Sequence, residues 1–407
     1  MTFTTAQVNG HRVDDMEPIN FVCIPFHDIK LAQLEGFRTR DSHLYRFFAQ
    51  HEHVMKTVVL NRPTMLLELL LKRKTLKSRG EVLYAKNGLY ITKINDRLFA
   101  VDILDLSFFR PVVHGKAFIP TLYSKHVRKY LKALSFLKVQ DYVTYESSPL
   151  TVALCDELKP KYKVFDGVDN LCKHSTYARI SQQLRELYTR VIDTYPMIFF
   201  NSRDSVRYFG ADDKNNVEFL ANGVDFNMFR GEATLRPTIM EGISGPVVIY
   251  AGKMQEMLDT ELIRACAKRL PQVTFLLLGK VLDAQVKAEL SNIANVKFTG
   301  DIAYPDLPDY IRNADVCFIP YRVDKQHGGD PIKFYEYMAA NKKTLSTPIG
   351  EIEKYHNGES VIVCARDKFV ESLERLLKLD AIVNNDLPES MTWSYKADYM
   401  VKKAISR

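Results

Sequence analysis

The chain has 407 residues, 46% hydrophobic and 26% charged, which excludes a disordered chain and allows two domains. Its formal net charge of +7 favours an anionic partner without identifying one. The six cysteines are scattered, with no CxxC pair and no Cys/His cluster, so neither a disulfide framework nor a zinc site is expected, and a reducing cytoplasm fits best.

The first half of the chain alternates strand and helix patterns. The apolar run Asn20–Pro25 predicts a first strand, and a polar loop and a helical pattern follow it. Asn87-Gly88, between alternating apolar positions, predicts a β-hairpin over Val82–Ile94. Three further strands are predicted, at Asp141–Tyr145, Lys161–Phe165 and Met197–Phe200. Helices are predicted between them, over 150–158 and 177–195.

The alternation restarts after residues 230–245, whose glycines and proline suggest a linker between domains. Strands are predicted at 247–251, 273–278, 295–299, 316–320 and 343–346, with helices over 257–270, 307–313 and 332–340. We therefore expect an α/β protein of two Rossmann-like, doubly wound parallel-sheet domains facing a cleft. The expected division is 1–235, 246–380 and a C-terminal segment, 381–407, that packs back toward the first domain.

Ligands of such sheets bind at the carboxyl ends of the strands. In the second domain, strand 247–251 is followed by Gly252 and Lys253, which allow close backbone approach and supply a cation. Tyr321 follows strand 316–320. Farther on, Gly328 and Gly329 precede a helix whose start, with Lys333, suits a diphosphate. Glu336 lies on the same helix face as Lys333 and suits ribose hydroxyls, although each residue alone also fits an ordinary packed or solvated role.

Other sites are less well supported. Neither a Walker loop nor GxGxxG is present, which disfavours a P-loop NTPase or a dinucleotide enzyme. Residues 65–79 (MLLELLLKRKTLKSR) join an apolar face to five basic residues, which suits an anionic membrane surface or an ordinary amphipathic helix. Basic residues are not interleaved with aromatics in a nucleic-acid module, so no nucleic-acid partner is expected.

Several motifs resemble those of the GT-B glycosyltransferases. "NGVDFNMF" (222–229) is similar to the motif that closes their N-terminal domain, and "KFYEYMAANKKTLST" (333–347) to their nucleotide-sugar helix. "YVTYESSP" (142–149), "KYKVFDGVDNL" (161–171) and "GKM" (252–254) are similar to the bacterial xanthan glucuronosyltransferase and related surface-polysaccharide enzymes. The motifs run from about residue 20 to residue 347.

This resemblance implies roles for single residues. It makes Asp169 the catalytic base, Lys333 the diphosphate contact, Met254 and Tyr321 residues of the nucleotide pocket, and Glu336 the ribose-side carboxylate. Gly328 stands where many retaining relatives have a glutamate, which favours an inverting reaction. Inversion needs a base for the acceptor hydroxyl and positive charge at the leaving diphosphate, which this fold supplies without a required metal.

The base has competitors in the first domain. Asp41 follows the first strand in a loop that also carries Glu35, Arg38 and Arg40; these three and Glu146 are placed on the acceptor side. Asp166 and His27 remain further alternatives for the base, and Asp166 is expected to be structural. For every one of these residues, capping a helix or shaping a turn is the plain alternative.

The function expected is metal-independent transfer of a sugar from a nucleotide-sugar, with UDP as the nucleotide, to a saccharide or polyprenyl-diphosphate-linked acceptor in bacterial surface polysaccharide synthesis. No cofactor besides the donor is expected. The first twenty residues lack the apolar stretch of a signal peptide, so a cytoplasmic protein, peripheral at the inner membrane face, is expected. The alternatives are a UDP-sugar epimerase or hydrolase of the same fold and a non-catalytic scaffold subunit.

Overall fold

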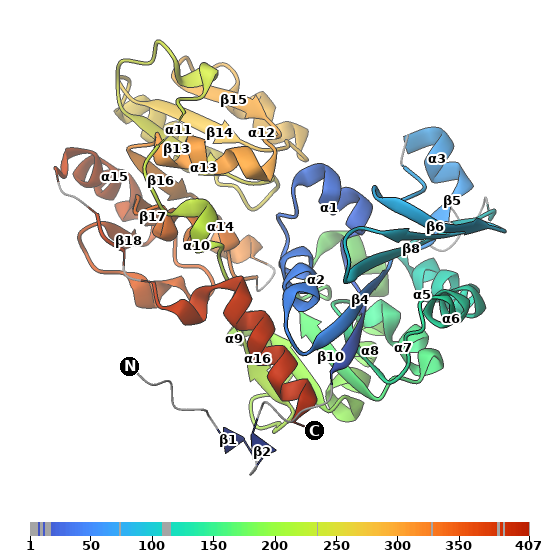
Figure 1. Ribbon diagram of the computed structural model, residues 1–407. Helices are drawn as coiled ribbons and strands as arrows, with labels where there is room; N and C mark the ends of the chain where they lie inside the picture. The colour runs from blue at the N-terminus through green and yellow to red at the C-terminus, as the bar shows by residue number, and fades with distance from the viewer. Residues whose placement is uncertain are drawn as a thin grey trace. The chain divides into compact units, whose positions relative to one another are not determined.

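The computed structural model describes residues 7–8, 11–12, 18–72, 75–107, 115–233, 235–326, 329–380, 383–385 and 387–406. The chain divides into two compact α/β units, each built on its own sheet (Figure 1). Unit 1 contains Met1–Asn201, Ser205–Leu220 and Trp393–Arg407, and unit 2 contains Ser202–Asp204 and Ala221–Thr392.

Unit 1 is built on a twisted sheet in which a parallel core carries an antiparallel hairpin at one side. The strand order is β12-β11-β10-β9-β3-β4-β8-β7-β6, and β5 pairs with β8. The strands are β3 (Ile19–Ile24), β4 (Val54–Leu60), β5 (Thr64–Met65), β6 (Glu81–Lys86), β7 (Leu89–Lys93), β8 (Leu98–Asp105), β9 (Tyr142–Glu146), β10 (Tyr162–Gly167), β11 (Met197–Phe200) and β12 (Val217–Phe219). A separate pair, β1 (Gln7–Val8) and β2 (His11–Arg12), is antiparallel.

The predicted hairpin is β6–β7. Asn87 and Gly88 join its strands with φ angles of 53° and 68°, the positive values that this two-residue turn requires.

Helices cover both faces of the unit 1 sheet. They are α1 (Ile29–Glu35), α2 (Arg40–Gln50), α3 (Leu66–Lys72), α5 (Phe118–Ser124), α6 (Val127–Phe136), α7 (Val152–Leu158), α8 (Ser181–Thr194), the greater part of α9 (Arg203–Tyr208), and α16 (Trp393–Ile405). Alternate residues of β3 face opposite ways: Val22 packs in a core that includes Tyr130 of α6, whereas Phe21 stacks on Phe48 of α2 at 4.5 Å. Both faces of the strand are therefore buried, as expected for a central parallel strand.

Unit 2 is built on a six-stranded parallel sheet of order β15-β14-β13-β16-β17-β18. Its strands are β13 (Val247–Ala251), β14 (Thr274–Leu278), β15 (Val296–Gly300), β16 (Val316–Ile319), β17 (Lys343–Ser346) and β18 (Val361–Val363). Its helices are α10 (Phe226–Phe229), α11 (Thr260–Arg269), α12 (Ala284–Leu290), α13 (Leu307–Arg312), α14 (Ile332–Ala339) and α15 (Phe369–Lys378). Strands alternating with helices in this way make a doubly wound fold.

The boundary between the units lies earlier than the linker expected at 230–245. Residues from Ala221 belong to unit 2, because the backbone N–H of Asn222 donates to Asp330 Oδ2 at 2.9 Å and the Arg312 guanidinium donates to the carbonyls of Met228 and Arg230 at 2.6 and 3.0 Å. The chain after Leu220 is thus pinned to the second sheet by contacts that local composition does not reveal.

The last helix, α16, packs on unit 1. Trp393 is fully buried and stacks on His43 of α2, with ring centroids 4.8 Å apart and planes 9° from parallel. Farther along, Asp398 pairs with His51 at 3.1 Å, and the Tyr399 hydroxyl donates to Glu218 at 2.6 Å. Within the described parts of the chain, no helix is long and apolar enough to cross a bilayer.

Burial of His43 predicts a pH-dependent stability. Burial, with the nearby Arg46 charge, lowers the pKa of His43 to about 3. The unfolded chain, with a histidine pKa of about 6.5, binds this proton first, so the unfolding free energy should fall as the pH drops from about 6.5 toward 3, by up to ~1.4 kcal/mol per pH unit. Trp393 is the only tryptophan, so its fluorescence can follow urea unfolding at each pH.

The matched variant is His43→Phe, which keeps an aromatic ring against Trp393 and removes the titrating group. The stability difference between the variant and the native chain should grow in favour of the variant as the solution is acidified. An equal pH dependence in both proteins would show that His43 contributes nothing to it.

Candidate active site

In unit 2 the topological switch point lies between β13 and β16, because the chain proceeds from β13 to β14 on one side and later places β16 on the other. The crevice at the carboxyl ends of two such strands is where open α/β sheets bind ligands. Gly252 directly follows β13, and Tyr321 follows β16 after one residue.

Lys333, in the first turn of α14, meets both strand ends. Its ammonium group donates hydrogen bonds to the hydroxyl of Tyr321 and, at 3.4 Å, to that of Tyr250, and lies 4.6–4.7 Å from both ring centroids. Burial and the neighbouring Tyr321 raise the pKa of the Tyr250 hydroxyl, so that group stays neutral. Within the described ranges no carboxylate forms an ion pair with Lys333, so its positive charge is held by rings and hydroxyls and remains available to an anion.

Gly252 has a φ of 151°, and a Cβ added there would lie 2.5 Å from Lys333 Nζ. The glycine therefore leaves the space that the ammonium group occupies. The next two residues are fixed by their backbones: the Lys253 carbonyl accepts from the Tyr250 hydroxyl at 2.9 Å, and the Met254 N–H donates to the Lys280 carbonyl at 2.9 Å. The side chain of Met254 is fully buried.

The start of α14 depends on Asp330, a residue that sequence reasoning did not single out. Its carboxylate accepts from the Asn222 N–H at 2.9 Å and from the Tyr335 hydroxyl at 2.8 and 2.9 Å. Gly329 directly precedes this anchored aspartate, whereas Gly328 lies outside the described residues. The sequence did contain a signal for this residue, because Asp330 stands directly before Pro331, the N-cap residue of α14.

Glu336 is buried one turn after Lys333, and its Oε1 accepts a hydrogen bond from the Tyr304 hydroxyl at 2.7 Å. Tyr304 follows β15 and was also missed by sequence reasoning. The predicted nucleotide-side residues of unit 2 are therefore drawn from strand ends and one helix start, as the fold requires.

In unit 1 the switch point lies between β3 and β9. The loops after these strands are joined: the Phe26 N–H donates to the Ser147 hydroxyl at 2.9 Å. The loop after β3 also carries His27, whose partial exposure of 25% leaves the imidazole accessible.

Asp41 holds this histidine. It is almost fully buried, and its Oδ2 accepts from the His27 N–H at 2.9 Å and lies 3.4 Å from His27 Nδ1. Its Oδ1 accepts from the Thr39 hydroxyl at 2.5 Å and the Ser42 N–H at 2.9 Å. Burial alone would raise the pKa of the Asp41 carboxyl, but the charge and hydrogen bonds of His27 lower it. Asp41 is thus placed to orient His27 and to stabilise its charged form.

Asp169 is exposed and lies two residues beyond β10. Its carbonyl accepts from the Tyr188 hydroxyl at 2.9 Å, which fixes the backbone at this position. Gly167 ends β10 without a positive φ, and a Cβ there would lie 2.5 Å from the Phe200 ring. The glycine is needed for close packing between β10 and β11.

The first aspartate of "FDGVDNL" is structural. Asp166 is fully buried and accepts hydrogen bonds from Arg40 Nε and its terminal nitrogen at 2.8 Å each, and from the Tyr145 hydroxyl at 2.6 Å. This corrects the placement of Arg40 on the acceptor side, because its guanidinium is enclosed by protein and engaged by Asp166.

Glu146 is also not accessible to an acceptor. It is fully buried, it accepts from the hydroxyls of Thr151, at 2.6 Å, and Tyr195, and burial raises the pKa of its carboxyl. Glu35 and Arg38, in contrast, are partly exposed and form an ion pair at 2.7 Å. Of the predicted acceptor-side residues, these two lie where a ligand could reach them.

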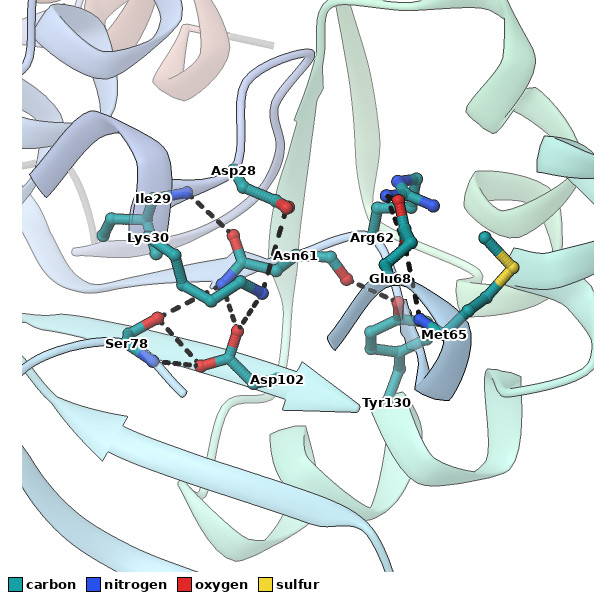
Figure 2. Close-up of polar contacts among 10 residues, drawn as sticks. All are labelled: Asp28, Ile29, Lys30, Asn61, Arg62, Met65, Glu68, Ser78, Asp102 and Tyr130. Carbon is teal, nitrogen blue, oxygen red and sulfur yellow. Dashed lines mark hydrogen bonds and ion pairs between the residues drawn. The ribbon is translucent and has the colours of Figure 1, made fainter. Parts of the chain in front are cut away.

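A second buried network fixes the loop after β3 (Figure 2). Asp102 of β8 accepts from Lys30 Nζ and Asn61 Nδ2 at 2.7 Å each, and from Ser78 N–H and Oγ at 2.8 Å each. Asn61 in turn accepts the Ile29 N–H at 2.9 Å, which anchors the start of α1. The segment next to His27 is therefore rigidly held. Among the described residues, no group of three or more His, Cys, Asp or Glu side chains could hold a metal ion.

Residues 245–379 match the protein family "Glycosyl transferases group 1". The Bacillus subtilis (strain 168) protein TuaH, whose name is that of a teichuronic acid biosynthesis glycosyltransferase, is 27% identical over 145 residues, a match that covers 35% of this chain and 36% of that protein. The chain thus spans about a third of the curated relative that it matches.

Solved structures match almost the whole chain. HepE of Anabaena, in complex with UDP and glucose, has 13% identity and a TM-score of 0.64 over 96% of this chain and 100% of that one. Sucrose-phosphate synthase of Thermosynechococcus elongatus has 13% identity and a TM-score of 0.64 over 96% of each chain. The chain has the GT-B fold of two Rossmann-like units, and the match to the group 1 glycosyltransferases lies within the second unit.

Proposed function

We propose that this protein is a glycosyltransferase that takes a sugar from a nucleotide-sugar bound at the switch point of unit 2. The observation that carries the proposal is the Lys333 ammonium group, fixed against Tyr250 and Tyr321 with no carboxylate partner in the described ranges. A cation preorganised in this way stabilises the negative charge that develops on the leaving diphosphate. The match of residues 245–379 to the group 1 family supports the same assignment.

UDP is the proposed nucleotide and a bacterial surface polysaccharide the proposed product. HepE, with the same fold, was solved with UDP and glucose, and the name of TuaH refers to teichuronic acid synthesis. The motifs in residues 142–171 support a relative of the xanthan glucuronosyltransferase as the narrower proposal. Lys333, with Lys253 one residue after Gly252, would offset the diphosphate charge without a required metal.

The proposed reaction inverts the configuration at the anomeric carbon of the donor sugar. A base must therefore remove the proton of the acceptor hydroxyl while the hydroxyl oxygen attacks that carbon. Asp169 is our choice because it is exposed just beyond a strand end, where reactive groups of this fold gather. His27, oriented by Asp41, is the competing base, since a partly exposed imidazole backed by a buried carboxylate suits proton transfer equally well.

The donor site predicts that Lys333→Ala weakens the binding of UDP by roughly 1.5–3 kcal/mol, because a charge-assisted contact to the diphosphate is lost. Gly252→Ala should weaken it as well, since its new methyl group takes the space of the ammonium. Calorimetric titration of UDP and uridine measures both effects; uridine, which lacks the diphosphate, should bind the Lys333→Ala variant as it binds the native chain.

Lys268→Ala, an exposed substitution in the last turn of α11, is the matched control. Native affinity for UDP in the Lys333 variant would remove the donor assignment. Rapid release of UDP from a UDP-sugar without any acceptor would instead favour the hydrolase or epimerase alternative.

The base prediction compares Asp169→Asn with His27→Asn. A general base contributes about 10²–10⁴-fold, so Asp169→Asn should lower turnover by about that factor and leave the affinity for UDP unchanged. Turnover is measured as UDP release in the presence of acceptor. If His27→Asn and Asp41→Asn abolish turnover while Asp169→Asn stays active, the base is the histidine.

The proposed acceptor is linked to a lipid diphosphate and is met at an anionic membrane surface. Leu70 and Leu71 of α3 are 66% and 73% exposed, and Lys77 and Arg79, which follow this helix, are exposed. The central basic residues Arg73 and Lys74 lie outside the described residues. Apolar side chains beside cations suit the boundary of an anionic bilayer.

Substituting Leu70 and Leu71 together with Gln should reduce sedimentation with phosphatidylglycerol vesicles, and 0.5 M salt should reduce it in the native chain. The control is Leu235→Gln, which replaces one exposed leucine of unit 2. A native chain that ignores these vesicles at low salt would leave residues 65–79 as an ordinary amphipathic segment.

A further inference from the structure

The feature that the proposed mechanism does not use is Arg62, which follows β4 at the same sheet edge as His27 and Asp169. Its backbone position is rigid, because the preceding Asn61 accepts the Tyr130 hydroxyl on its carbonyl at 2.7 Å and donates from Nδ2 to Asp102 at 2.7 Å. Figure 2 shows Arg62 turned toward Glu68, beside this network.

The guanidinium of Arg62 is only partly satisfied. One terminal nitrogen donates to both oxygens of Glu68, at 2.8 and 3.0 Å, while Nε and the other terminal nitrogen make no hydrogen bond to any residue in the described ranges. Arg40 shows the contrasting arrangement, since it binds Asp166 through Nε and a terminal nitrogen together. Arg62 is 20% exposed, so its remaining donors can be reached by a ligand.

Glu68 holds the arginine in place. Its carboxylate also accepts a hydrogen bond of 3.3 Å from the Met65 N–H, just before α3. Only 10% of the Glu68 side chain is exposed. Burial alone would lower the pKa of the Arg62 guanidinium, but the charges of Glu68 and Asp28 raise it, so the group is always charged. Because the carboxylate engages one terminal nitrogen, the N–H groups of Nε and of the other terminal nitrogen remain as charged donors, which suit phosphate or carboxylate oxygens.

The surroundings of Arg62 connect it with the proposed base. The Tyr177 hydroxyl lies within the electrostatic influence of both Asp169, which raises its pKa, and Arg62, which lowers it. Lys116 adds a second cation, 5.4 Å from the centre of the Tyr177 ring. Two cations and an aromatic ring therefore lie along the edge that leads from β4 to β10.

We propose that Arg62 binds an acidic group, phosphate or carboxylate, of the acceptor. Because β4 and β10 are three strand spacings apart, roughly 14 Å, this acidic group lies beyond the sugar ring that carries the attacking hydroxyl. The inference rests on the proposed function for the identity of the acceptor, but not for the anion site itself. The source is either a uronic acid or the diphosphate of a lipid carrier.

The test is calorimetric titration of the full chain saturated with UDP, so that anions do not occupy unit 2. The probes are methyl β-D-glucuronide, its neutral match methyl β-D-glucoside, and farnesyl diphosphate. The native chain should bind one of the acidic probes more tightly than the glucoside. Arg62→Gln should weaken that probe by at least about tenfold, the loss expected for a hydrogen bond between charged groups, and leave the glucoside unaffected.

Glu68→Gln separates binding from folding, because its amide oxygen can still accept from the Arg62 guanidinium while the competing negative charge is removed. This variant should bind the acidic probe more tightly than the native chain. Arg97→Gln is the matched control. Arg97 is exposed and precedes β8, so it lies at the sheet edge opposite to the one that carries Arg62. If Arg62→Gln is poorly folded, Arg62→Lys retains the charge; acidic-probe binding weaker than in the native chain, with unchanged binding of the glucoside, supports the site.

The preferred acidic probe identifies the source: glucuronide points to a uronic acid and farnesyl diphosphate to a lipid carrier. Equal affinity of the native chain for acidic and neutral probes overturns the inference, as does an unchanged or weaker acidic probe in Glu68→Gln. If the native chain does not bind UDP in the titration that precedes these measurements, the donor assignment is wrong, and the inference about Arg62 is not affected.

Discussion

The ion pair between Arg40 and Asp166 is the constraint on which the arrangement of unit 1 depends. Both side chains are enclosed by protein, and removing one partner of such a pair costs about 3–5 kcal/mol, because the other charge stays buried. The pair fixes the first turn of α2 against the end of β10. Since Asp41 is the next residue of α2 and Asp169 follows β10, the same contact positions Asp169 and the carboxylate that orients His27.

The fold could be predicted from the sequence because its signals are local. Apolar runs, their spacing and the Asn87-Gly88 turn indicated most strands of both sheets, and the parallel order follows from their alternation with helices. Val54–Leu60 and Leu98–Asp105 are among the strands that were not predicted. Val54–Leu60 has Lys56 and Thr57 inside its apolar run, and β8 has Asp102 near its centre, a charge that is stabilised by the hydrogen bonds of Lys30 and Asn61.

The residues of the candidate site also fall into two groups, those that local sequence signals indicate and those whose placement depends on distant partners. Gly252, Tyr321 and Lys333 could be found because each follows a strand or begins a helix, so sequence order alone places them at one edge. Arg40 and Glu146 were misplaced because the burial of a charged side chain depends on distant partners: Asp166 is 126 positions from Arg40, and Tyr195 is 49 from Glu146. Tyr304 was missed for that reason too, since its partner Glu336 lies 32 positions away on α14.

The packing of α16 has a consequence for how the chain reaches its folded state. His51 and Asp398 are 347 positions apart, and Trp393 covers His43 over a similar separation. During synthesis one face of α2 therefore stays uncovered until the chain as far as α16 has left the ribosome. Contacts of such long range are slow to form, and apolar surface exposed meanwhile invites association, so completion of the first unit is tied to completion of the last helix.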